Sequence, residues 1–143
     1  MIKRAITIFV SVCVAIFVLI QFVPYGRNHV NPPDTKQLVW KDPASENTFR
    51  TICMQCHSNH TEWPWYTNIA PGSWLVQSDV DNARLAMNLS ETDVSEYKAG
   101  NLARQVQADR MPPFQYKLLH WDAIFSDAQK KQLIDGINKT FPQ

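Results

Sequence analysis

The sequence has no large excess of charge of either sign, no low-complexity tract and no internal repeat. Its 143 residues contain 14 Lys and Arg against 13 Asp and Glu, a formal net charge of +1. No Lys/Arg run or basic stripe occurs, which argues against nucleic acid as a partner, because nucleic-acid-binding proteins carry a clustered positive surface. A chain of this length has room for one domain and one short additional segment.

The sequence also lacks any useful length of strand-like alternation between apolar and polar residues. Apolar residues instead recur at helical spacing, so we expect an all-α fold. About four helices are expected. They cover residues 45–56, 73–87 and 94–107, and a last helix begins at the capping-box pattern Ser126-Asp127-Ala128-Gln129.

One long apolar run lies near the N-terminus. Ala5 to Val23 is nineteen residues without a charge, and as a helix it extends about 28 Å, close to the roughly 30 Å hydrocarbon core of a bilayer. The following residues offer no small-residue cleavage site of the signal-peptide kind. We therefore expect an uncleaved transmembrane anchor over residues 1–23.

The charges that flank this run predict its orientation. Lys3 and Arg4 precede it, so the positive-inside rule places the N-terminus in the cytoplasm and the rest of the chain on the other side of the membrane. Residues 24–43 contain four prolines and read as an unpacked linker. Residues 44–143 form the expected domain, and the chain beyond residue 23 has twelve basic and thirteen acidic residues, a net charge of −1.

Two of the three cysteines lie in Cys53-Met54-Gln55-Cys56-His57. C-x-x-C-H is the attachment signature of c-type haem: two thiols on one turn reach the two vinyl groups, and the histidine binds iron from the proximal side. A redox dithiol is disfavoured because it is typical of a strand-to-helix turn. A zinc site completed by His60 is cramped, and a plain disulfide is the third alternative.

The sixth iron ligand is predicted to be Met111, which opens a Met-Pro-Pro-Phe loop. Two prolines stiffen the backbone behind this thioether and limit the entropy that is lost on binding. His120 and the absence of any protein ligand stay open as alternatives. Four other candidates are less suitable. Met54 lies in the attachment loop, His29 in the linker, His60 on the proximal side and Met87 on the apolar face of a helix.

Aromatic residues gather in the loop after the motif. Trp63, Trp65 and Tyr66 are predicted to wall a flat apolar ligand. The carbonyl of Pro71 is a candidate acceptor for the second ring N–H of His57, and an equally good interpretation is that Pro71 merely ends the loop.

Two stretches resemble the haem-binding-domain family of bacterial c-type cytochromes. They are CMQCHSNHTEWPWYTNIAPGSWLV and MPPFQYKLLHWDAIFSDAQKKQLIDGI, within residues 45–140. The resemblance implies a cytochrome c-like domain of about four helices around one covalently bound haem. It also implies an exported protein of the bacterial inner membrane with the haem domain in the periplasm. In this resemblance Cys53 and Cys56 are the thioether donors, His57 is the proximal ligand and Met111 the distal ligand. The sequence departs from ordinary cytochromes c, which carry a glycine-rich stretch after the histidine, and segment 88–92 lacks an aromatic residue that members of the family often carry.

The expected function is one-electron transfer between redox proteins, without enzymatic activity, because iron with two protein ligands leaves no position for a substrate. The alternative is a haem-based sensor that binds a small ligand at an open sixth position.

The sequence predicts one covalently bound haem per chain. The purified protein should give the pyridine-haemochrome spectrum of haem c, and the haem should stay with the chain after extraction with acidified acetone. A colourless protein would instead support the zinc or disulfide alternative.

Overall fold

The computed structural model describes all residues from 1 to 143 and contains helices but no strand. The predicted all-α class is therefore confirmed. In chain order, the helices are α1 (Ile2–Ile20), α2 (Pro43–Thr48), the π-helix η1 (Phe49–Cys53), the 3-10 helix η2 (Trp65–Asn68), α3 (Gly72–Ala86), the 3-10 helix η3 (Val94–Glu96), α4 (Ala99–Gln107), α5 (Phe114–Lys117), the 3-10 helix η4 (Trp121–Ala123) and α6 (Asp127–Thr140).

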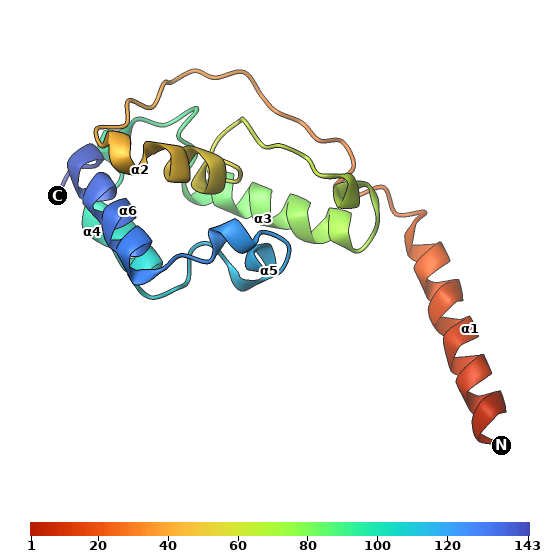
Figure 1. Cartoon of the computed structure of the whole chain (residues 1–143). Coiled ribbons are helices and arrows are strands. Elements are labelled where there is room, and N and C mark those ends of the chain that lie inside the picture. Colours follow the sequence, from red (N-terminus) through yellow and green to blue (C-terminus); the bar gives the residue numbers. More distant parts are fainter. The chain divides into compact units, whose positions relative to one another are not determined.

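The chain forms two compact units. Unit 1 comprises residues 1–30 and 62–82, and unit 2 comprises residues 31–61 and 83–143. Helix α1, drawn in red in Figure 1, belongs to unit 1, and none of its residues is buried. It is long and apolar enough to cross a membrane by length and composition, a property that signal sequences share.

Unit 1 ties the end of α1 to the turn that precedes α3. The side-chain amide of Gln21 donates to the carbonyl oxygen of Ala70 (2.9 Å) and accepts from the backbone N–H of the same residue (3.0 Å). Gly26 has a φ of 77° and lies so close to the carbonyl oxygen of Ser73 that a Cβ would collide with it. The chain at residues 21–26 thus packs directly against residues 70–77.

The core of unit 2 lies between α2, α4 and α6. Helix α6 packs against both α2 and α4 (Figure 1). Its capping box is present as predicted, with Ser126 and Gln129 each binding the other's backbone. The apolar residues of this core come from segments far apart in the sequence: Leu38, Trp40, Phe49, Met54, Met87, Leu89, Ala99, Val106, Leu133, Ile137 and Phe141.

The predicted starts of two helices, at residues 45 and 94, were wrong. The first helix begins at Pro43 with Asp42 as its N-cap, because the Asp42 carboxylate accepts from the backbone N–H of Ser45. The third helix begins at Ala99, whose N–H donates to the carbonyl of Pro142 (2.9 Å), after an extended Tyr97 and Lys98.

Part of the predicted linker is also packed. Leu38 and Trp40 are buried, and the Trp40 ring stacks on Phe49 with ring centroids 4.0 Å apart. The indole N–H of Trp40 donates to the hydroxyl of Ser45 (3.2 Å), which donates to Asp42 (2.7 Å). A segment that is rich in proline can still supply core side chains, and here it does.

The tight fit of α6 against this network predicts the effect of a small substitution. Gly136→Ala places a methyl group against the Ser45 hydroxyl and the Trp40 ring, so we expect a loss of about 1–3 kcal/mol in the free energy of unfolding. Gly100→Ala is the matched control, because a Cβ there meets nothing within 4 Å, and it should stabilise α4 by about 0.5–1 kcal/mol. Urea unfolding of both variants measures the difference, and equal stability would contradict the packing.

Candidate functional site

The two motif cysteines lie on one turn at the end of η1. The backbone N–H groups of Cys56 and His57 both donate to the carbonyl of Cys53, at 3.3 and 3.0 Å. The N–H of Met54 donates to the carbonyl of Phe49 (3.1 Å), so the turn before the motif is widened to π-helical spacing. Such widened turns often occur at functional sites. Cys53 and Cys56 are half-buried and form no disulfide.

The electrostatics of Cys53 are unlike those of a reactive thiol. Burial raises the pKa of Cys53 to about 12, and the neighbouring Cys56 adds to the increase. The reactive thiol of a redox dithiol needs a lowered pKa. No three His, Cys, Asp or Glu side chains are placed to hold a metal ion together, so the ligand set of a tetrahedral zinc site is not assembled.

His57 is fixed by the segment that follows α3. Its ring Nδ1 lies 3.0 Å from the carbonyl oxygen of Met87, and its own carbonyl accepts from the N–H of Leu89 (2.9 Å). Burial lowers the pKa of His57, and the backbone carbonyls of Met87 and Ala83 partly oppose this. The imidazole is therefore neutral, with a proton on Nδ1 and the lone pair on Nε2, which is the form that binds a metal.

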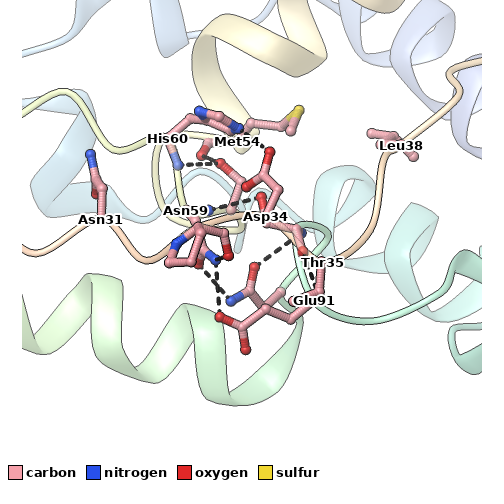
Figure 2. Close-up of polar contacts among 12 residues, drawn as sticks. Asn31, Asp34, Thr35, Leu38, Met54, Asn59, His60 and Glu91 are labelled. Atoms are coloured by element: carbon pink, nitrogen blue, oxygen red, sulfur yellow. Dashed lines mark hydrogen bonds and ion pairs between the residues drawn. The ribbon is translucent and has the colours of Figure 1, made fainter.

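Asn59 adds further hydrogen bonds between the chain after the motif and the segment that follows α3. It accepts from the side chain of Asn88 (2.9 Å), and its backbone N–H donates to the hydroxyl of Ser90 (3.1 Å). Its side-chain N–H donates to Glu91 (2.9 Å), as Figure 2 shows. All three of Asn59, Asn88 and Ser90 are buried, so residues 57–59 and 88–91 are held side by side by hydrogen bonds that water does not compete for.

Two further side chains, Arg84 and His60, hold the loop after the motif. Arg84 donates to the carbonyl of Ser58 (2.9 Å) and to the side chains of Asn31 (2.9 Å) and Thr61 (3.0 Å). His60 pairs with Asp34 (2.6 Å; Figure 2). His60 thus points to the segment before α2.

Met111 belongs to the same unit as the motif. It follows α4, its backbone N–H donates to Gln105, and 40% of its surface is exposed. It begins a stretch in which six large apolar residues are exposed: Met111, Phe114, Leu118, Leu119, Trp121 and Ile124. Exposed apolar residues at this density indicate a surface that binds an apolar ligand or partner.

The residues of unit 2 fit the haem that the sequence predicts. One turn carries two thiols, the next residue is a neutral histidine with Nε2 as its metal-binding nitrogen, and a thioether lies in an exposed apolar stretch. These are the residue types that would hold a c-type haem.

The other predicted pocket residues lie in unit 1. Trp63 stacks on His29 (4.9 Å between ring centroids), Trp65 is 75% exposed, and Tyr66 is half-buried. The carbonyl of Pro71 accepts from the N–H groups of Trp74 and Leu75, whereas Nδ1 of His57 faces the carbonyl of Met87. The role of these aromatic residues as haem walls stays a prediction.

Sequence reasoning missed the residues that hold His57 in place. Every residue carries a carbonyl, so nothing in the sequence distinguishes that of Met87. Asn88 and Ser90 directly after a helix are a weak signal, because such residues often end helices by binding nearby backbone. The exposed apolar residues of segment 114–124 could have been recognised in the sequence. A segment that directly follows two prolines rarely carries so many large apolar side chains.

Comparison with known proteins adds two findings. The family model described as "Haem-binding domain" matches residues 15–139. The protein named "Cytochrome c peroxidase Ccp" of Escherichia coli (strain K12) is 26% identical over 95 residues, which are 61% of this chain and 20% of that protein. The chain thus spans about a fifth of that relative. No solved structure is significantly similar.

The hydrogen bonds around Asn59 predict the effect of removing one partner. Asn88→Ala leaves the buried amide oxygen of Asn59 and the N–H of Ser90 without their partners, so we expect a loss of about 1–3 kcal/mol in the free energy of unfolding. Asn82→Ala, at an exposed position of α3, is the control and should change stability by less than about 0.5 kcal/mol. Denaturant unfolding measures both, and equal losses would contradict the proposed pairing.

Proposed function

The chain belongs to the haem-binding-domain family, and on that premise we propose that it is a membrane-tethered c-type cytochrome that transfers one electron at a time. The observation that carries the proposal is the state of His57: its Nδ1 faces a backbone carbonyl, its imidazole is neutral, and two thiols precede it on the same turn. A histidine that ligates iron is ordinarily fixed in this way through its second nitrogen.

In this proposal four side chains hold the cofactor. Cys53 and Cys56 would attach it through thioether bonds, and His57 and Met111 would ligate its iron. Haem would supply reversible one-electron chemistry between ferric and ferrous iron. The carbonyl of Met87 and the N–H of Leu89 hold the His57 ring and backbone in one orientation, which would lower the reorganisation that accompanies electron transfer.

The location follows from α1. Its apolar length supports a single span, and Lys3 and Arg4 at its start support a cytoplasmic N-terminus with the haem domain in the periplasm. The partners in this proposal are redox proteins, since a fixed one-electron carrier needs a donor and an acceptor. Nucleic acid has no place among them, because the chain beyond α1 carries a net charge of −1.

We propose no enzymatic activity for this chain. The peroxidase named among its relatives shares only a fifth of its length with it, so that activity is not carried over. Iron that is bound by both His57 and Met111 has no position left for peroxide or another substrate.

The role of Met111 predicts a change in potential. A thioether favours ferrous iron, so Met111→Ala should lower the reduction potential, on the order of a tenth of a volt given that axial ligands span about 0.8 V. The ferric spectrum should shift toward the high-spin form, and the reduced variant should bind carbon monoxide. Redox titration and absorption spectroscopy measure both.

Met87→Leu is the matched control, because Met87 is buried in the core and its side chain should not reach iron. It should keep the wild-type spectrum and potential. A wild-type protein that is already high-spin and binds carbon monoxide rapidly would favour the alternative function, a sensor or small-ligand-binding module with an open sixth position.

A further inference from the structure

We propose that the loop that contains Trp65 and Ile69 in unit 1 lies in the headgroup region of the membrane, beside the end of α1. The partner is the lipid surface itself. The proposal rests on the tethering part of the proposed function, since it requires α1 to cross the bilayer. It assigns to Trp65 a role other than the wall of the haem site that the sequence predicts.

Hydrogen bonds fix the position of this loop relative to the end of α1. Gln21 follows the last residue of the helix, and its side-chain amide makes two hydrogen bonds with the backbone of Ala70, at 2.9 and 3.0 Å. Arg27 donates to the same Gln21 side chain (3.0 Å). Two hydrogen bonds from one amide to one residue fix its distance and direction, so the loop cannot swing away from the helix end without breaking both.

The length of α1 determines how deep in the bilayer this loop lies. Helix α1 has 19 residues and is about 28 Å long, nearly the thickness of the hydrocarbon core. The uncharged run of residues 5–23 spans this thickness, so Gln21, two residues before its end, lies close to the boundary between acyl chains and headgroups. Because Ala70 is bonded to Gln21, it lies at the same depth, and its neighbour Ile69 and the η2 turn that starts at Trp65 are within reach of the headgroup layer.

The exposed side chains near the end of α1 are aromatic or apolar. Trp65 is 75% exposed, Ile69 40%, Phe22 80% and Tyr25 48%. Tryptophan and tyrosine are enriched where the membrane meets water, because one end of each ring is apolar and the other is polar. These four residues come from two segments that the bonds of Gln21 hold together.

Charged side chains are absent from both segments that meet at Gln21. Residues 63–78 contain no charged side chain, and neither do residues 5–26. Insertion of a charged group below the headgroups is costly, and the two segments themselves carry none. The Tyr25 hydroxyl, the polar end of that ring, donates to the Asp81 carboxylate (3.4 Å), so this end of the ring would face the headgroups and water. The first charge after α1 is Arg27, whose sign suits the phosphate groups of lipids.

The test measures where this loop lies in the full-length haem-loaded protein, reconstituted in nanodiscs of phosphatidylcholine and phosphatidylglycerol. A nitroxide label on the native Cys13 reports the anchor. In a Cys13→Ser background, Trp65→Cys and Ile69→Cys place labels on the loop, and Lys131→Cys places one on an exposed site of α6. The Ile69→Cys protein keeps Trp65, so loss of that side chain does not decide the result.

Continuous-wave EPR then compares collisions with oxygen, which partitions into lipid, and with a water-soluble nickel complex. The proposal expects the oxygen-to-nickel ratio at positions 65 and 69 to be several-fold higher than at 131 and lower than at 13. A lipid-exposed Cys13 label with water-exposed labels at 65 and 69 would overturn the membrane contact and leave the tether intact. A water-exposed Cys13 label would overturn the tether and the membrane contact together.

Other occupants of this surface give distinct results. A label at 65 that is shielded from both reagents and relaxes faster in the ferric protein would show that the loop faces haem. Shielding together with dipolar broadening that disappears on dilution with unlabelled protein would show a second copy of this chain. Either result would overturn the proposal, while the spectrum and the potential of the haem would still decide the proposed electron-transfer function.

Discussion

The hydrogen bond between Nδ1 of His57 and the carbonyl of Met87 is the interaction on which the rest of the site depends. It fixes the tautomer, so that Nε2 is the nitrogen that carries a lone pair. It joins the turn of the two cysteines to the chain that leaves α3, two segments thirty residues apart. The same carbonyl-bearing segment supplies Leu89 and Met87 to the core of unit 2, so the position of the imidazole is determined by the packing of the whole unit.

This arrangement separates the tasks of neighbouring residues. Apart from Nδ1 of His57, the bonds described above that hold the loop come from the backbone of the motif and from the residues just after it. Asn59 shows the division most clearly, because its backbone N–H and both ends of its side-chain amide bond to segment 88–91 or to Pro33.

The sequence predicted those features that depend on local chemistry. The helical class, the apolar N-terminal helix and the capping box at Ser126 follow from spacing and side-chain type, and each is present. Other features depend on tertiary contacts with the backbone, which every residue carries. The start of α4 is set by a bond from Ala99 to Pro142, and the burial of Trp40 is set by a hydroxyl on α2, so neither could be read from local pattern.

The raised pKa of Cys53 has a consequence for the life of the protein before the cofactor is attached. Disulfides form by attack of a thiolate, not of a thiol. With a pKa of about 12, Cys53 is almost entirely in the thiol form at pH 7. Before a cofactor is attached, Cys53 is therefore a poor nucleophile toward another disulfide. The same burial that suits an apolar ring thus keeps the Cys53 sulfur in its protonated form.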